Sequence, residues 1–224
     1  MIQQIQQLDN APGTHEQWCR VALHRGPSSA PRNHSRTGDT KQLVQTRLHD
    51  RFAWDDCVGM EVLRVTAGDG ARLKQVRLAA LEDAPSAFGS THESEASRTA
   101  AEWAQRAVAG SRGNDRATFF AQLDEEIVGL AGGYREERSS LIVELVSLWV
   151  APHVRGRGVG NLLVDAVTAW ARETNTTSIS LWVTRGNRPA ERLYESKGFV
   201  TTGVLKPLPS DSARDEARMY LTLG

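Results

Sequence analysis

The clearest chemistry in the sequence lies at positions 155–160, a segment reading RGRGVG between a strand-like run and a helical one. Glycines at alternate positions let the backbone turn tightly and approach a ligand closely. The first amides of the following helix have no intrahelical acceptor, so they meet an anion with the positive end of the helix dipole. Arg155 and Arg157 add positive charge beside them. This combination favours binding of a pyrophosphate group.

Two other phosphate-binding loops are excluded by particular residues. A P-loop requires Gly-Lys-Ser/Thr at the start of the helix, whereas Gly160 is followed by Asn161 and Leu162. A Rossmann fingerprint requires the spacing G-x-G-x-x-G and an acid at the end of the next strand. Here the glycines alternate, and the next strand ends with WVTR at positions 182–185. A glycine-rich turn that binds no ligand is the structural alternative that remains.

One acidic residue, Glu144, stands alone in an apolar run that reads VELVS at positions 143–147. Burial there would raise the pKa of its carboxyl group, and such a carboxylate can act as a general base near neutral pH. The alternative is a side chain that faces solvent or pairs with a nearby arginine. The cysteines, Cys19 and Cys57, both precede the regularly patterned part of the chain, so a thiol nucleophile is not expected.

The residues before this segment predict strands and helices that could position it. A strand at 60–65 precedes a helix with Asp69 as candidate N-cap and Ala84-Pro85 at its end. A second helix is predicted at 93–109, with Gly110 after it. Three strands with the spacing of a meander follow, at 117–123, 127–134 and 141–150.

The C-terminal half continues the alternation. The helix after the glycine-rich segment runs to about residue 174, with a periodic apolar face made of Leu163, Val167 and Trp170. Asn187 is the candidate N-cap of another helix, which Gly198 ends. The remaining strands are predicted at 178–183, 199–205 and 218–223. This order predicts a mixed α/β domain of three layers.

Two motifs make the chain resemble the GNAT acetyltransferases. The sequence LWVAPHVRGRGVG at 148–160 is similar to their acetyl-CoA motif, whose core is Q/R-x-x-G-x-G/A, with Arg155, Gly158 and Gly160 in the defining positions. The sequence NRPAERLYESKGF at 187–199 resembles the signature N-x-x-A-x-x-L-Y-x-x-x-G-F. The resemblance covers about residues 60 to 223 and is weaker over the first half.

The resemblance implies the acyl-CoA N-acyltransferase fold: a central mixed sheet of about six or seven strands flanked by helices on both faces. It also implies acetyl-CoA as co-substrate, without a metal. In this family two parallel strands splay apart, and the match assigns them to 141–150 and 178–183. Unpaired main-chain groups of the first strand would then bind pantetheine. The implied cofactor-binding residues are Leu148, Trp149, Val150, Arg155, Gly156, Arg157, Gly158, Val159, Gly160 and Asn187.

The reaction that the resemblance implies is direct attack of a primary amine on the thioester, in a ternary complex. Tyr194 is the expected acid that protonates the departing thiolate, and Glu144 is the expected base. Glu93 and Glu95 lie where related enzymes often form the amine pocket, although their pattern favours solvated helix acids. The acceptor is a small-molecule or peptide amine whose identity stays open. A catalytically inactive domain that binds acyl-CoA as a sensor is the alternative.

Composition sets the remaining expectations. Lys+Arg and Asp+Glu both number 27 among 224 residues, which leaves no basic footprint for nucleic acid or an anionic membrane. The chain has no apolar run of about 18 residues and no signal-like start, so a cytoplasmic location is expected. Residues 1–58 lack apolar periodicity and are expected to be a disordered extension of a domain at 59–224. A homodimer is compatible with these features.

Overall fold

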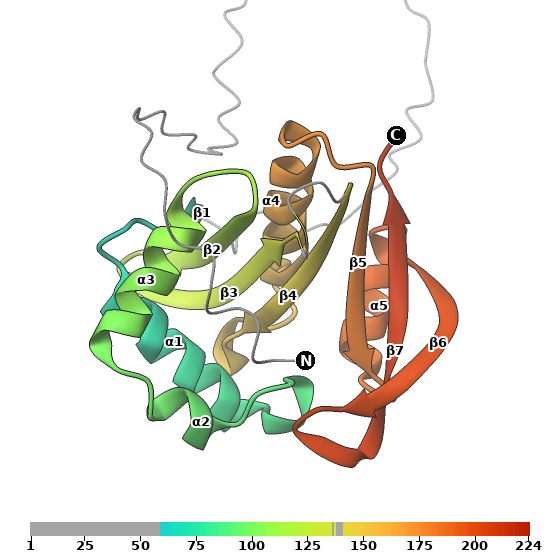
Figure 1. The fold of residues 1–224 in the computed structure, drawn as a ribbon, viewed down its shortest axis with the longest axis horizontal. Coiled ribbons are helices and arrows are strands. Elements are labelled where there is room, and N and C mark those ends of the chain that lie inside the picture. Colours follow the sequence, from blue (N-terminus) through green and yellow to red (C-terminus); the bar gives the residue numbers. More distant parts are fainter. Residues whose placement is uncertain (1–58, 136, 138–140) are drawn as a thin grey trace, which may run out of the picture.

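The computed structural model describes residues 59–135, 137 and 141–224, so the extension predicted at 1–58 lies outside the described residues. Seven strands form one sheet in the order β1-β2-β3-β4-β5-β7-β6 (Figure 1). Only β4 and β5 pair in parallel; the other neighbours among these strands are antiparallel. The strands are β1 Met60–Arg64, β2 Arg116–Leu123, β3 Glu126–Tyr134, β4 Ile142–Val150, β5 Ser178–Thr184, β6 Val200–Leu208 and β7 Asp211–Thr222.

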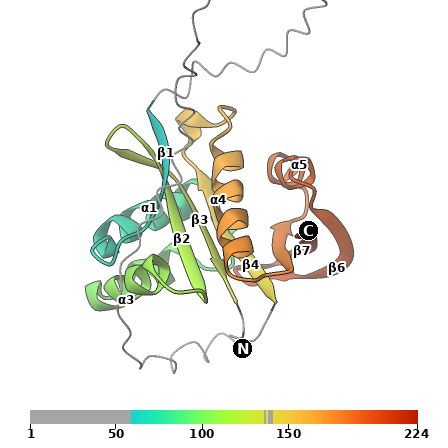
Figure 2. The same cartoon turned by 90° about the horizontal axis from the view of Figure 1, so that it is seen from above.

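Helices cover both faces of this sheet, as predicted. α1 and α3 lie against one face of β1 to β4, and α4 lies against the opposite face (Figure 2). The α-helices are α1 Gly70–Asp83, α2 His92–Ala96, α3 Ala100–Ser111, α4 Val159–Glu173 and α5 Arg188–Ser196; short 3-10 helices occupy η3 Pro85–Ala87 and η4 Pro152–Val154. The end of α5 contacts α4 through an ion pair, in which Lys197 Nζ lies 2.7 Å from Asp165.

The helix that follows the glycine-rich segment packs through its predicted apolar face. Leu163 and Val167 are fully buried and Trp170 nearly so. Glycine in β3 makes this approach possible, since a Cβ at Gly133 would lie 2.8 Å from the Trp170 ring. The C-terminal part of α4 therefore packs closely against β3.

The predicted helix at 93–109 is in fact two helices. Thr99 caps α3 through a capping box with Glu102, whose carboxylate accepts a hydrogen bond from the Thr99 amide at 2.8 Å. The sequence TAAE at 99–102 matches the pattern of a capping box, which indicates the start of a helix. The first helix also differs from expectation at its start: Asp69 occupies the N-cap position, but its carboxylate accepts hydrogen bonds from Thr66 at 2.7 Å instead of capping α1.

The last two strands are longer than predicted. β7 begins at Asp211, whereas the sequence indicated a start near residue 218. Exposed side chains fill most of β6 and the first half of β7, so no apolar alternation marks them. Backbone pairing places them: β7 pairs with β5, and β6 pairs with β7 at the edge of the sheet. Within the described ranges, no helix has the length and apolarity needed to cross a bilayer.

Candidate active site

The sheet opens between its two parallel strands. Pairing of β4 with β5 ends at Glu144 and Ser180, although β4 continues to Val150 and β5 to Thr184 (Figure 1). The separation agrees with the predicted splay and leaves a cleft of about 80 Å³ between the strands. Its walls come from η3, β4, β5 and α5, and they include Leu148, Trp182, Asn187 and Tyr194.

A β-bulge turns β4 at the mouth of this cleft. Trp149 pairs with Leu130 and Val146 with Gly132, so Ser147 and Leu148 together face a single residue of β3. Ser147 adopts a left-handed conformation with φ 60°, which is uncommon for a non-glycine residue. Arg77 Nη1 donates to the Ser147 hydroxyl at 3.2 Å and so supports the bulge. Bulges bend strands and increase their twist, which accounts for the divergence from β5.

The glycine-rich segment leads into α4 as predicted. Gly156 and Gly158 have φ values of 80° and 83°, where L side chains are strained. The first helical hydrogen bond runs from the Leu162 amide to the Gly158 carbonyl at 3.2 Å. The amides at 159–161 precede that bond and have no acceptor within the helix. This helix start is therefore suited to an anion.

The two arginines of this segment differ in their surroundings. Arg155 pairs with Asp83 at the end of α1 and donates from Nε to the Val150 carbonyl at 2.9 Å. Asp83 offsets the charge of Arg155, so this side chain contributes less to an anion site than the sequence suggested. Arg157 is exposed at the loop surface. The helix amides and Arg157 are thus the stronger candidates for phosphate contacts.

Two of the predicted cofactor-binding residues, Gly160 and Trp149, contribute to packing and hydrogen bonding within the fold. A Cβ on Gly160 would lie 2.6 Å from Leu193 Cδ1, so this glycine admits α5 against the start of α4. The Trp149 side chain is buried and donates from Nε1 to Asp83 at 2.8 Å. Trp149 pairs with Leu130 of β3 and does not line the cleft, whereas Leu148 lines it directly.

Tyr194, the predicted acid, is one of the residues that line the cleft. Asn187 is the N-cap of α5, and its Oδ1 accepts a hydrogen bond from the Ala190 amide at 3.4 Å. Two turns later Tyr194 faces the cleft with 6% exposure and packs against Phe199 at a ring distance of 5.7 Å. Burial raises the pKa of the Tyr194 phenol above its ordinary value. The phenol therefore stays protonated and can donate a hydrogen bond.

Glu144 lies at the last paired position before the strands separate. It is half-buried, and its register neighbours are Ser180 in β5 and Tyr134 in β3. The geometry places it on the same strand as the bulge, three residues before Ser147. Its assignment as a base remains a prediction.

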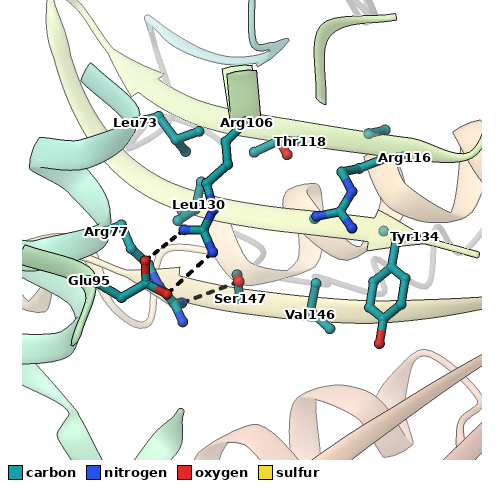
Figure 3. Close-up of a pocket in the computed structure, with 13 residues that line it drawn as sticks. Leu73, Arg77, Glu95, Arg106, Arg116, Thr118, Leu130, Tyr134, Val146 and Ser147 are labelled. Carbon is teal, nitrogen blue, oxygen red and sulfur yellow. Dashed lines mark hydrogen bonds and ion pairs between the residues drawn. The ribbon is translucent and has the colours of Figure 1, made fainter. Parts of the chain in front are cut away.

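A second cavity, of about 100 Å³, lies on the sheet face covered by α1, α2 and α3 (Figure 3). It shares Val146 and Ser147 with the cleft, so the two hollows meet at the bulge. The expectation that Glu95 is solvated is wrong: it is 3% exposed and lines this cavity, whereas Glu93 is exposed. Spacing along one helix gave no sign of this burial, because its main partner, Arg106, belongs to α3.

A family model described as Acetyltransferase (GNAT) family matches residues 77–199, more than half of the chain. The chain belongs to the GNAT acetyltransferase family. The match spans the bulge, the glycine-rich segment and Tyr194, and it starts within α1.

Individual GNAT relatives match part of the chain. Streptothricin acetyltransferase from Streptomyces lavendulae is 31% identical over 112 residues, which are 49% of this chain and 58% of that protein. The chain thus spans less than two thirds of that relative's length. A GNAT acetyltransferase structure from Streptococcus pneumoniae has a TM-score of 0.63 at 21% identity, covering 74% of this chain and 99% of that one. A putative acetyltransferase from Salmonella typhimurium with its cofactor acetyl-CoA has a TM-score of 0.56 at 19% identity, covering 74% and 94%.

Proposed function

We propose that this GNAT protein transfers the acetyl group of acetyl-CoA to an amine by direct attack within one ternary complex. The observation that carries the proposal is the cleft between β4 and β5, which has Tyr194 in its wall. Main-chain amide and carbonyl groups of β4 lose their β5 partners there, and buried groups of this kind need new ones. The two amides of a pantetheine arm have the matching chemistry. The Salmonella structure with acetyl-CoA supports the same choice of cofactor.

The start of α4 supplies the proposed diphosphate site. Gly158 ends the loop in a conformation that leaves open space where a side chain would stand. The amides at 159–161 then face an anion with the helix dipole behind them. Arg157 adds charge, while Arg155 anchors the loop to Asp83 and Val150.

The proposed reaction needs a base, a group that stabilises the oxyanion and an acid, and residues around the bulge and the cleft can fill these roles. Glu144 accepts a proton from the incoming amine, directly or through water, because only the neutral amine is a nucleophile. Main-chain N–H groups of β4 at Leu148 and Val150 stabilise the negative charge that develops on the thioester oxygen. Tyr194 donates its hydroxyl proton toward the departing sulfur. No enzyme-bound acetyl group is required, since both substrates meet at the bulge.

A panel of amines incubated with acetyl-CoA tests this function through release of free thiol. The enzyme should release thiol faster with at least one amine than without any, and Tyr194→Phe should release it far more slowly. Coenzyme A should also raise the melting temperature by linkage, whereas NADH should not. Stabilisation by coenzyme A without turnover on any amine would favour the alternative function, a domain that binds acyl-CoA without catalysis.

A further inference from the structure

The cavity on the helical side of β4 has an unusual charge balance. Among the described residues, three arginines line it, namely Arg77 from α1, Arg106 from α3 and Arg116 from β2, against one carboxylate, that of Glu95. Figure 3 shows Arg77, Glu95 and Arg106 at one end, Arg116 with Tyr134 at the other, and Ser147 between them. Positive charge therefore surrounds the place where an acceptor would approach the bulge.

The carboxylate of Glu95 is already fully engaged. It accepts from Arg106 Nη1 at 2.7 Å and from Arg98 Nε at 2.8 Å, and Arg98 also approaches Glu102 at 3.6 Å. Arg77 donates hydrogen bonds to two hydroxyl groups, those of Ser147 and Ser90. Among the described residues, no carboxylate forms an ion pair with it. Glu95 therefore neutralises positive charge at only one end of the cavity.

Of these three guanidinium groups, that of Arg116 has no hydrogen bond or ion pair with another side chain in the described part of the chain. It is half-buried, and its guanidinium carbon lies 5.3 Å from the centre of the Tyr134 ring. Within 59–135, 137 and 141–224, no acidic side chain forms an ion pair with it. Burial, and next the charge of Arg106, lower the pKa of Arg116. An anion in the cavity would relieve both effects, because it would pair with the desolvated cation and screen the repulsion.

We propose that the acceptor amine carries a carboxylate on a neighbouring carbon, and that Arg116 binds this carboxylate while the amine faces Ser147 and the cleft. This substrate class, amino-acid-like amines, rests on the proposed acetyl transfer. A guanidinium presents parallel N–H donors that match the two oxygens of a carboxylate. Tyr134 and the hydroxyl of Thr118 lie beside Arg116 in the same wall.

The size of the cavity agrees with a small anionic group. One water needs roughly 10–15 Å³ of cavity volume, so about 100 Å³ holds a carboxylate with the carbon that bears the amine. Polyamines fit this charge pattern poorly, because a second ammonium group would enter beside three arginines. The only carboxylate among the lining side chains that the structure describes, that of Glu95, is already shared between Arg98 and Arg106.

Matched acceptors test the proposal. Free L-amino acids, their C-terminal carboxamides and spermidine are compared in two ways: binding to the coenzyme A-saturated protein by calorimetry, and acetylation by acetyl-CoA. The free acids should bind and react at least tenfold better than their amides, and spermidine should be the poorest. Arg116→Gln should weaken binding of the acids by about 10- to 100-fold, as expected for a lost charged hydrogen bond, and leave the amides unchanged.

Two control variants separate a binding role from a loss of folding. Arg116→Lys keeps the charge but not the fork and should bind acids with intermediate affinity. Arg172→Gln removes an exposed arginine of α4 and should change nothing. Equal binding of acids and amides, or an unchanged preference in Arg116→Gln, would overturn the substrate class even if amines are acetylated. Acid-selective binding without acetylation would support the anion site and reject the proposed catalysis.

Discussion

At the scale of single residues, the account depends most on Tyr194. This residue lines the cleft, and burial keeps its phenol protonated above its ordinary pKa of about 10. A departing alkyl thiolate has a pKa near 8.5, so full proton transfer from the phenol is uphill. A hydrogen bond to the sulfur still stabilises the charge, and solvent can complete the protonation. In a helix that did not border the cleft, a buried tyrosine of this kind would serve only to pack the core.

Tyr194→Phe removes one oxygen and keeps the ring against Phe199. Turnover should fall by roughly 10²–10⁴, the range for general acid–base groups, while coenzyme A affinity and melting temperature stay nearly unchanged. Because burial raises the pKa, wild-type turnover should show no loss from this phenol as pH passes 10. Steady-state kinetics across pH give the measurement. A loss of less than about twofold in the variant would assign Tyr194 to packing alone.

Glu144→Gln preserves shape and removes the proposed base. Turnover should fall most near neutral pH and recover toward wild type as pH approaches the amine's own pKa, about 8 to 10, because the amine then loses its proton unaided. The ratio of wild-type to variant kcat, measured from pH 6 to pH 10, reports this trend. A ratio that stays constant over that interval would make Glu144 a binding or structural residue.

Glu95 makes a prediction about stability. Burial alone would raise its pKa, but the charges of Arg106, Arg77 and Arg98 outweigh it and the pKa is lowered. A lowered pKa in the folded state stabilises the fold above the unfolded value, about 4.3, and this contribution is lost as pH falls through the folded value. Glu95→Gln should therefore lower the free energy of unfolding by about 1–3 kcal/mol at pH 7 and by less below pH 4.

Urea titrations of Glu95→Gln at the two pH values measure this difference. Glu93→Gln is the matched control, because Glu93 lies on the same short helix with an exposed side chain. It should change stability by less than about 0.5 kcal/mol. Equal destabilisation by Glu95→Gln at both pH values would mean that charge at this position does not support the fold.

At the scale of elements, the site depends on close packing that glycines permit. Arg77 of α1 and Arg106 of α3 both line the arginine-rich cavity on the helical side of β4. The two helices meet where a Cβ on Gly70 would lie 2.9 Å from the Ala104 amide nitrogen. Contact with backbone cannot be relieved by a rotamer change, so this glycine sets how closely the cavity walls approach.

Gly70→Ala should force α1 and α3 apart and cost about 1–3 kcal/mol, despite the better helix propensity of alanine. Gly68→Ala, two residues earlier with only Thr66 nearby at 3.8 Å, should be nearly neutral. Each kcal/mol corresponds to roughly 2–4 °C in Tm for a domain of this size, so thermal unfolding distinguishes the two variants. Equal Tm values would show that the helices can separate freely.

Local signals were enough to predict most elements. The glycine-rich segment and the α5 signature each lie within a few residues, so type and spacing reveal them. The bulge at Ser147 was not predictable, since a serine with positive φ leaves no mark on sequence. The charged cavity was missed for another reason: its residues come from six elements, and only the fold brings Glu95, Arg77 and Arg106 together.

At the scale of the whole molecule, the described domain contains every residue assigned to the site. Residues 59–224 alone should fold, remain soluble and gain the same melting-temperature increase from coenzyme A as the full chain. The reason is that β1, which begins at Met60, already completes its pairing with β2. Thermal unfolding of both chains with and without coenzyme A measures this. A truncated chain that unfolds would place residues 1–58 in the core.

A crystal structure of the protein with coenzyme A tests the central claim most directly, because the cleft, the loop and Tyr194 must all meet one ligand. The expected result has the diphosphate on the amides at 159–161, pantetheine along β4, and the sulfur within about 4 Å of the Tyr194 hydroxyl. Gly158→Asp should abolish this binding, since it places a side chain and negative charge in the phosphate site. Coenzyme A bound outside the cleft between β4 and β5, or a sulfur remote from Tyr194, would contradict the account.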